Sequence, residues 1–564
     1  MSFLESIFAR LESSADQVLL TELRESGSVP VTGRELLSMI SQARAFLFSR
    51  GLKKGDRCVL LAANSIRWIA MDLAIMAEGL IVVPLYSRQA PAELCSMMKD
   101  GSPLLICCGD AGLRDSIVQN WPEAPPRALF DEIFAAEDKA ETPARAPFDS
   151  AQERSAPDRV SDSDIVAIIY TSGTSGEAKG VMLTAGNVGH ILQCTSGQLD
   201  ILMKHRPGQD RVYQWAPLNF AAAWITTLTS LLRGSSIFMN TDLTKLAGEL
   251  RSVAPDYFVN VPALLERVRK AVDEQLWKTA GVVRTVYLKA KAAYMRRQEG
   301  TERFVDSIWL ALANTGIFPT IRKKMIGSNL KALICGSAPL SVETQLFFMM
   351  LGIPVLQVYG LTETTAICTM DDPRHVEPGR VGPAIGGIEM KVAENSEIVV
   401  RGPNIFSGYW NRPDETAKVL RDGWFHTGDQ GEVNAAGNWK IIGRIKNLII
   451  LNSGHNIAPE PIEDEVLAHL PAAQFAVVAG NGRSFLTLLV TGEVTAEQVQ
   501  SAIDAVNPAL PHYKQVRAFQ IIKDPFTIEN GLLTANGKLK RDLITQRFQP
   551  QIEQMYSVKQ SHTA

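Results

Sequence analysis

Cysteine is scarce in this sequence, and its spacing excludes two classes of protein. The 564 residues include seven cysteines, with no Cys-x-x-Cys pair and no disulfide-like spacing. A small disulfide-rich secreted domain or a zinc ribbon would need such pairs. We therefore expect buried, reduced thiols in a cytoplasmic protein, and no neighbouring motif identifies a catalytic cysteine.

A net positive charge and a long uncharged apolar run are also missing. The net charge is −3, and Lys and Arg are spread along the chain, which argues against nucleic acid as a main partner. The most apolar stretch, residues 69–85, contains Asp72 and Glu78, so it is too short and too charged for a transmembrane segment. Peripheral contact with a membrane is compatible with the sequence, as are a monomer and a homodimer.

Two domains are expected, because 564 residues exceed what one hydrophobic core organises. In the N-terminal part, helix-like patterns at 34–50 and 65–78 alternate with strand-like runs at 57–62 and 80–84. This alternation predicts an α/β fold, a large N-terminal domain of mixed or parallel sheets flanked by helices. We place this domain at residues 1–443.

Two tracts within that domain have a different composition. Residues 134–163 are rich in Ala, Pro and charged residues and predict an exposed connection. Residues 263–325 predict a long, mainly helical tract with basic clusters such as residues 289–297. We interpret the second tract as a solvated helical insertion.

The last part of the chain, residues 444–564, predicts a small α+β domain. Strand-like runs at 475–479, 485–491 and 518–522 alternate with helical patterns. One of these helices opens with a capping box, in which Thr495 and Gln498 satisfy each other's backbone N–H groups. The size of the region is typical of a domain.

A glycine- and hydroxyl-rich loop follows the apolar run at residues 165–170. Its sequence, Thr-Ser-Gly-Thr-Ser-Gly-Glu-Ala-Lys-Gly, occupies residues 171–180. Such a loop can turn many backbone N–H groups toward one anion, and its lysine adds a full positive charge. We predict that a triphosphate binds here, at Thr171, Ser172, Gly173, Thr174, Ser175, Gly176 and Lys179. A P-loop fits poorly, because that motif needs Gly-Lys-Ser/Thr leading into a helix.

This loop resembles the signature of the adenylate-forming superfamily, which comprises acyl-CoA synthetases, luciferases and the adenylation domains of peptide synthetases. The usual proline before the lysine is Ala178 here. Further blocks follow in the family's order, at residues 336–340, 359–365, 422–429, 443–447, 453–463 and 530–541. The resemblance covers about Val31 to Phe548, which short-motif coincidence does not produce.

The resemblance implies a role for each block. Gly336, Ser337, Ala338 and Pro339 would border the adenine of ATP, with Tyr359 stacked on it and Gly360 beside it. Thr362 would contact the α-phosphate and Glu363 would hold Mg²⁺. Asp429 and Arg444 would bind the ribose. The catalytic residues would be Lys538, Thr362 and Lys179, whereas Lys540 and Arg541 are expected to be surface charges.

The resemblance also implies coenzyme A as the thiol acceptor and a hinge. Ser453, Gly454 and His455 would line the path of the pantetheine arm. Lys446 stands at the family's hinge position, which would make the C-terminal domain mobile. The residue after it is Asn447, where the family often has Asp.

The acyl pocket departs from the family pattern. Where the family usually has Pro-x-x-His, this chain has Pro217-Leu-Asn-Phe220. Trp224 stands where long-chain members place an aromatic gate, and Leu361 is a further candidate contact of the acyl chain. Core packing is an equally good interpretation of Phe220 and Trp224.

These residues imply an ATP-dependent enzyme that activates a carboxylic acid, expected to be a medium- or long-chain fatty acid, and passes it to coenzyme A. Two alternatives stay open. A fatty acyl-AMP ligase that loads an acyl carrier protein would share every ATP residue. A catalytically silent nucleotide sensor would not need Lys538.

Overall fold

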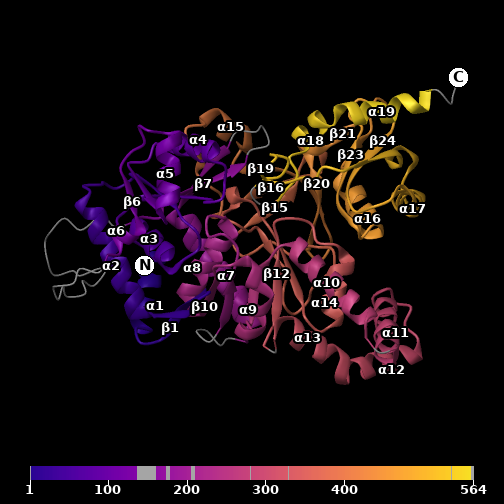
Figure 1. Ribbon diagram of the computed structural model, residues 1–564, viewed down its shortest axis with the longest axis horizontal. Coiled ribbons are helices and arrows are strands. Elements are labelled where there is room, and N and C mark those ends of the chain that lie inside the picture. Colours follow the sequence, from indigo (N-terminus) through magenta and orange to yellow (C-terminus); the bar gives the residue numbers. More distant parts are fainter. Residues whose placement is uncertain are drawn as a thin grey trace. The chain divides into compact units, whose positions relative to one another are not determined.

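The computed structural model describes residues 2–135, 160–172, 178–204, 210–279, 281–327, 329–534 and 537–560. Gly173, Thr174, Ser175 and Gly176 of the predicted phosphate loop lie outside these residues, as do the side chain of Ser172 and most of the tract at 134–163. The chain forms two compact units, coloured along the sequence in Figure 1. Unit 1 contains the described residues up to Glu389 and Val400–Phe425, and unit 2 contains Met390–Val399 and the described residues from His426 onward.

The first sheet of unit 1 has seven strands, in the order β17-β8-β7-β4-β3-β5-β6. Its central strands β4, β3 and β5 are apolar apart from Arg57 at the start of β3, and they pair in parallel, as predicted from the continuous apolar runs. The strands are β3 (Arg57–Leu61), β4 (Ile81–Leu85), β5 (Leu105–Cys108), β6 (Arg127–Leu129), β7 (Ile165–Ser172), β8 (Ala178–Thr184) and β17 (Gly408–Tyr409).

The second sheet of unit 1 has eight strands, in the order β14-β13-β12-β11-β9-β10-β1-β2. The six inner strands pair in parallel and the two edge strands are antiparallel. The strands are β1 (Val18–Arg24), β2 (Gly27–Thr32), β9 (Arg211–Gln214), β10 (Ser236–Asn240), β11 (Tyr257–Asn260), β12 (Ala332–Cys335), β13 (Val355–Tyr359) and β14 (Thr369–Met370).

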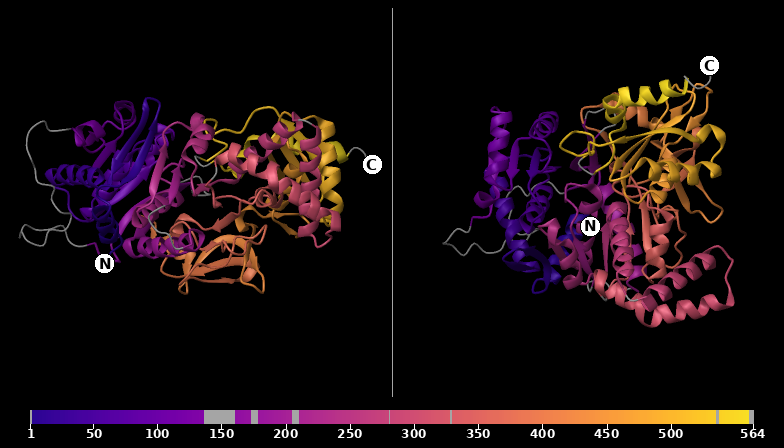
Figure 2. Two further views of the ribbon diagram at one scale, coloured as in Figure 1. Left: turned by 90° about the horizontal axis from the view of Figure 1, so that it is seen from below. Right: turned by 45° about the vertical axis from the view of Figure 1, so that its right-hand side comes forward.

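Helices pack beside these strands, as the left view of Figure 2 shows for the indigo and purple part of the chain. The apolar stretch at 69–85 forms most of a buried helix and the buried strand β4. The helices are α1 (Phe3–Ser13), α2 (Gly33–Ser49), α3 (Ile66–Ala77), α4 (Pro91–Gly101), α5 (Ala111–Asn120), α6 (Phe130–Ile133), α7 (Ala185–Leu202), α8 (Ala221–Arg233), α9 (Leu246–Val253), α14 (Val342–Met350) and α15 (Pro413–Val419).

The predicted helical tract is confirmed. It consists of α10 (Pro262–Trp277), α11 (Gly281–Gln298), α12 (Phe304–Leu312), a π-helical turn (Ala313–Ile317) and α13 (Phe318–Ile326). The tract is not wholly solvated, because one face of it packs into a hydrophobic core with β11, β12 and α14. Its other face is exposed.

Unit 2 contains the predicted α+β elements around a three-stranded sheet, β23-β24-β25. Alternate residues of the sheet enter two hydrophobic cores, so Ala476 and Val478 pack on one face and Val477 and Ala479 on the other. The elements are β21 (Ile449–Ile450), β22 (Asn456–Ile457), α16 (Glu460–His469), β23 (Ala473–Ala479), β24 (Leu486–Gly492), α17 (Ala496–Val506), β25 (Val516–Ile522), α18 (Arg541–Arg547) and α19 (Gln549–Gln560).

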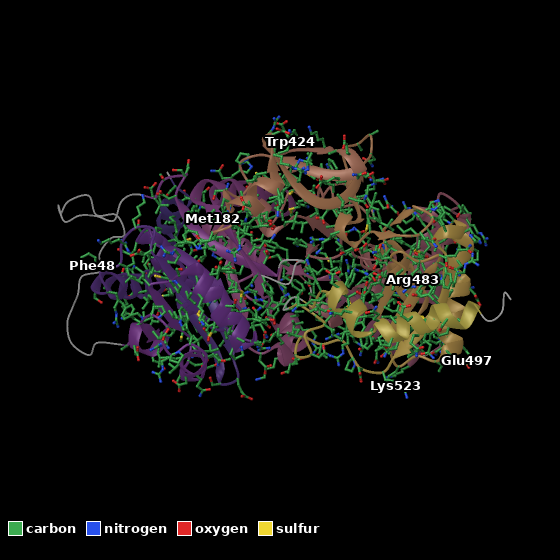
Figure 3. The ribbon with its side chains drawn as sticks, turned by 90° about the horizontal axis from the view of Figure 1, so that it is seen from above. Phe48, Met182, Trp424, Arg483, Glu497 and Lys523 are labelled. Carbon is green, nitrogen blue, oxygen red and sulfur yellow. The ribbon has the colours of Figure 1, made fainter. Side chains whose placement is uncertain are left out.

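Unit 2 has three further features: a capping box on one helix, a strand that it shares with unit 1, and an ion pair on its last helix. The capping box of Thr495 and Gln498 is present at the start of α17. Strand β19 (Trp424–Val433) crosses from unit 1 to unit 2, pairing with β18 (Leu420–Arg421) in unit 1 and with β20 (Trp439–Arg444) in unit 2. Arg483, which Figure 3 labels, forms an ion pair with Glu553 of α19.

Candidate active site

The predicted phosphate loop is carried by an antiparallel hairpin. Strands β7 and β8 pair in register up to Thr171↔Lys179 and Ser172↔Ala178. Lys179 therefore continues into a strand, as predicted, and not into the helix that a P-loop requires. The neighbouring Met182 of β8, labelled in Figure 3, belongs to the same hairpin.

Lys179 is held by two groups that sequence analysis missed. Its Nζ lies 2.6 Å from Oε2 of Glu415 and 5.3 Å from the ring centroid of Tyr409. Lys179, and then Lys418, lower the pKa of Glu415 to about 2. Glu415 therefore remains ionised at neutral pH, and a bound triphosphate would compete with this carboxylate for the lysine.

Tyr409 joins the hairpin to Glu363, the predicted magnesium ligand. It lies on β17, paired with Val181 of β8, and its phenol donates a 2.8 Å hydrogen bond to Oε1 of Glu363. The backbone carbonyl of Glu363 also accepts from the N–H of Phe406, at 2.9 Å. Because these groups belong to unit 1, the structure brings a lysine, a phenol and a carboxylate together at one end of the hairpin.

The donor set around Glu363 fits a magnesium ion that is held mainly by substrate. Mg²⁺ is usually bound by one or two carboxylates together with phosphate oxygens and water. No group of three or more His, Cys, Asp or Glu side chains suited to a metal occurs in the described part of the chain. One carboxylate linked through Tyr409 to the β7–β8 hairpin matches the first arrangement and not a closed protein cage.

The predicted adenine residues follow two neighbouring strands. Strands β12 and β13 pair in parallel, so Gly336 and Gly360 follow them at the same edge of the sheet. A Cβ on Gly336 would lie 2.6 Å from Val358, and one on Gly360 would lie 2.3 Å from the carbonyl of Ala366. Both positions therefore require glycine, one before Ser337, Ala338 and Pro339 and the other before Leu361 and Thr362. Tyr359 ends β13 and is largely buried.

The two acyl candidates lie in different surroundings. Phe220 occupies the position just before α8 and is half-buried, with its ring centroid 5.8 Å from that of Tyr86. Trp224, one turn later, is 1% exposed, and its indole N–H donates a 2.9 Å hydrogen bond to Oδ2 of Asp72. Burial raises the pKa of Asp72 to about 7. In this structure Trp224 thus packs in the core, whereas Phe220 faces a second aromatic ring.

In unit 2, the two residues predicted to bind the ribose form an ion pair with each other. Asp429 and Arg444 are register partners on β19 and β20, and Nε of Arg444 lies 2.9 Å from Oδ1 of Asp429. The backbone N–H of Asp429 also donates to the hydroxyl of Thr427, at 3.0 Å. Their role at a ribose stays a prediction.

The predicted hinge residue, Lys446, lies in a short 3₁₀ helix, Ile445–Asn447, directly after β20. Its partial burial, together with the neighbouring charge of Arg444, lowers the pKa of Lys446 to about 8. The amide of Asn447 donates a 2.6 Å hydrogen bond to Oε1 of Glu460 on α16. Both partners of this bond, like Lys446 itself, belong to unit 2.

One expectation about the C-terminal motif is wrong. Arg541 is not a surface charge: its side chain is 16% exposed and forms an ion pair with the buried Glu463, and it also lies 3.8 Å from Glu460. The physical reason is that a carboxylate buried beside β23 needs a cation near it, and the first turn of α18 supplies one. Lys538, three residues earlier, is exposed, and its backbone N–H donates to the hydroxyl of Thr534, at 3.1 Å.

The predicted pantetheine loop is a tight turn. Gly454 has a φ of +83°, and Oγ of Ser453 lies 2.9 Å from Nδ1 of His455. The imidazole of His455 stacks on Tyr513, with ring centroids 4.1 Å apart and an interplanar angle of 16°. This aromatic stack was not predicted, because nothing in the sequence links residues so far apart.

Comparisons with known proteins give one consistent result. The family model described as AMP-binding enzyme matches residues 9–410, and the model described as AMP-binding enzyme C-terminal domain matches residues 446–560. The chain is 27% identical to a long-chain-fatty-acid–CoA ligase, FadD15, of Mycobacterium bovis, over 98% of this chain and 96% of that protein. It is 25% identical to a chloroplastic long-chain-fatty-acid–[acyl-carrier-protein] ligase, AEE15, of Arabidopsis thaliana, over 97% of this chain and 85% of that protein.

Among solved structures, the fold is similar to that of the anthranilate CoA ligase AuaEII in complex with anthranoyl-AMP. The TM-score is 0.74, with 17% sequence identity and coverage of 97% of each chain. At this identity the likeness supports the fold. It matches the predicted α/β architecture with a large N-terminal and a smaller C-terminal part.

Proposed function

Because this chain belongs to the AMP-binding enzyme family, we propose that it is an ATP-dependent acid–thiol ligase. It joins a carboxylic acid to AMP and then transfers the acyl group to coenzyme A. The observation that carries this proposal is the link from Lys179 through Tyr409 to Glu363 in unit 1. A cation and a carboxylate at the end of a phosphate-loop hairpin suit a triphosphate with a divalent cation.

In the first step, a carboxylate oxygen attacks the α-phosphorus of ATP and the bond to pyrophosphate breaks. Both reactants are anions, and a carboxylic acid with a pKa of about 4–5 is already ionised at neutral pH. The residues therefore need to neutralise charge and align the atoms rather than remove a proton. We assign this task to Lys538, between the carboxylate and the α-phosphate, and to Thr362 at the α-phosphate.

The phosphates and the nucleoside have separate binding groups in this proposal. Lys179 and the residues from Thr171 to Gly176 hold the pyrophosphate end. Glu363 would hold Mg²⁺, which stabilises the charge of the leaving pyrophosphate when it is bound. The Asp429–Arg444 pair would accept the ribose hydroxyls, and the loops after β12 and β13 would border the adenine.

In the second step, the thiol loses its proton to water, its sulfur attacks the acyl carbon, and the bond to AMP breaks. Lys538 is not needed for this step, so we propose that the C-terminal domain turns at Lys446 and exposes the acyl-adenylate to the thiol. The place of Lys446 in a short 3₁₀ helix between β20 and β21 supports this assignment, because such a connection contains few backbone hydrogen bonds to break. The loop at Ser453–His455 would then guide the pantetheine arm.

We infer that the acid is a medium- or long-chain fatty acid, because the relatives compared here are named for long-chain fatty acids. Coenzyme A is the favoured acceptor, and an acyl carrier protein is the alternative that the name of the plant relative supports. We propose a cytoplasmic location, which the seven free cysteines support, six of them buried.

The proposal is tested by measuring AMP release from ATP and magnesium with acids of increasing chain length and with aryl acids, and with coenzyme A or a carrier protein as acceptor. We expect release with medium- or long-chain acids and coenzyme A. Release that requires the carrier protein would select the alternative acceptor. No release with any acid would refute the proposed reaction.

A further inference from the structure

The helical tract of unit 1 presents an exposed apolar face that the proposed reaction does not use. Phe304 of α12 is 91% exposed, and Val305, Ile308 and Leu312 are each at least half exposed. We call these four residues the apolar stripe. Positions 304, 308 and 312 recur at the spacing of one helix face, so the stripe is continuous along α12.

The opposite face of the same helix is fixed in the core of unit 1. Leu310, Ala313, Phe318 and Ile326 are buried in one hydrophobic cluster with residues of β11 and β12. Asp306, at the start of α12, is buried and forms an ion pair with Arg296 of α11. Figure 1 and the right-hand view of Figure 2 show α11 and α12 beside one another at the edge of unit 1.

Residues Phe304–Ile326 are long and apolar enough to cross a membrane by length and composition alone. Crossing would remove Leu310, Phe318 and Ile326 from the core and separate Asp306 from Arg296. A helix with one face in a protein core and one apolar face exposed is suited to lie along a surface.

The charge around the stripe is strongly positive. Residues 278–327 contain ten Lys or Arg and three Asp or Glu, although the whole chain has a net charge of −3. The rest of the chain is therefore net −10. Arg296 is paired with Asp306 within the tract, and Lys291 is paired with Glu343 outside it, so the other cations carry the excess charge. Nζ of Lys289 lies 4.4 Å from the ring centroid of Trp309, and Arg303, Lys323 and Lys324 are exposed at the two ends of the helical segment.

We propose that the apolar stripe and its cations dock unit 1 onto an anionic lipid surface. Phe304, Ile308 and Leu312 would enter the boundary between headgroups and acyl chains, while the Lys and Arg side chains contact lipid phosphates. A second copy of this chain is a poorer occupant, because a symmetric contact would bring two strongly positive tracts together. The proposal goes beyond the proposed ligase reaction and does not depend on it.

The test is sedimentation of the full chain with vesicles of phosphatidylcholine and phosphatidylglycerol in equal parts, compared with phosphatidylcholine alone. We expect binding to the mixed vesicles that weakens as salt is raised. Phe304→Ser with Ile308→Ser should weaken binding about tenfold or more, because two large apolar side chains no longer leave water. The matched control is Phe48→Ser on α2, another exposed phenylalanine of unit 1 (Figure 3), which should bind as the unchanged protein does.

A second pair of variants tests the charges. Lys323→Glu with Lys324→Glu should reduce the preference for anionic vesicles, whereas Lys523→Glu, an exposed lysine of unit 2 labelled in Figure 3, should not. Thermal unfolding of each variant checks that it folds. The proposal is overturned if the protein does not bind anionic vesicles, or if Phe48→Ser is as harmful as the stripe variant. It is also overturned if the stripe variant still binds the mixed vesicles normally but loses self-association or loses binding to an acidic protein.

Discussion

Two of the buried carboxyl groups, one in each unit, have surroundings of opposite kind. Glu463 of unit 2 forms an ion pair with the guanidinium of Arg541 and accepts a hydrogen bond from the backbone N–H of Val478. Asp72 of unit 1 accepts only the indole N–H of Trp224 among the described residues, and its Oδ1 is buried with no hydrogen-bond partner there.

The difference shows how burial of an acid leads to two outcomes. Burial raises the pKa of Glu463, but Arg541 opposes that shift, and the ion pair becomes a brace between α16 and α18. Asp72 has no cation beside it, so burial raises its pKa to about 7 and makes its ionisation sensitive to pH near neutrality. The first acid fixes the segment that follows Lys538, whereas the second makes the core around Trp224 depend on protonation.

The largest effect is expected from Arg541→Met, which leaves Glu463 buried without its cation. Removing one partner of a buried pair costs about 3–5 kcal/mol, because the remaining charge is uncompensated. Urea unfolding of unit 2 should therefore shift to much lower concentration. Adding Glu463→Gln should recover most of the loss. If Arg541→Met unfolds at the same urea concentration as the unchanged protein, Arg541 is not a brace.

Asp72→Asn should give an effect that grows with pH. The folded pKa of about 7 lies above the ordinary value of 3.8, so stability from Asp72 is lost as pH rises through that window. The neutral amide avoids this loss. Relative to the unchanged protein, we expect the free energy of unfolding of Asp72→Asn to be no higher below pH of about 4. Above pH of about 7, we expect it to be higher by on the order of 4 kcal/mol at most.

Thermal unfolding of Asp72→Asn and of the unchanged protein across this pH range measures the difference. Asp162→Asn, at an exposed position, is the control and should show no such trend. A gain that is the same at every pH would mean that Asp72 does not titrate in this window.

A smaller effect is expected from Trp224→Phe, which removes the indole N–H from Asp72. A buried acceptor that loses its partner costs about 1–3 kcal/mol. Because that hydrogen bond lowers the pKa of Asp72, its loss should also move the titration to higher pH. The same change in the Asp72→Asn background separates the hydrogen bond from the lost indole volume. Additive effects would show that the two side chains are not coupled.

The smallest effect is expected for a variant that removes the hydrogen bond to Glu363, a carboxyl group that is only partly buried. Tyr409→Phe removes the hydrogen bond to Glu363 and leaves the ring beneath Lys179. Acid-dependent pyrophosphate exchange should fall by about tenfold at most, as for one lost bond to a charged group. Tyr294→Phe on α11 is the control. Unchanged exchange in Tyr409→Phe would remove this tyrosine from the proposed site.

The elements that are set by residues adjacent in the sequence could be predicted, whereas contacts between residues far apart in the sequence could not. Apolar runs predicted the parallel strands, and the loop between β7 and β8 was recognised because its donors are contiguous. Tyr409 and Glu415 were missed because they reach Lys179 only through the pairing of β17 with β8. Arg541 was misplaced because a charge within a Lys/Arg run resembles a surface residue until its partner, 78 positions earlier, is known. Trp224 could not be assigned because its burial depends on α3.

The central claim is that this chain makes a mixed anhydride of a carboxylic acid and AMP, with Lys538 stabilising the transition state. Its most direct test is acyl-adenylate formation without coenzyme A, by the unchanged protein and by Lys538→Ala, together with thioester formation from supplied acyl-adenylate. We predict that Lys538→Ala lowers the first reaction by about a hundredfold or more and largely spares the second. No acyl-adenylate from the unchanged protein, or equal losses in both reactions, would contradict the account.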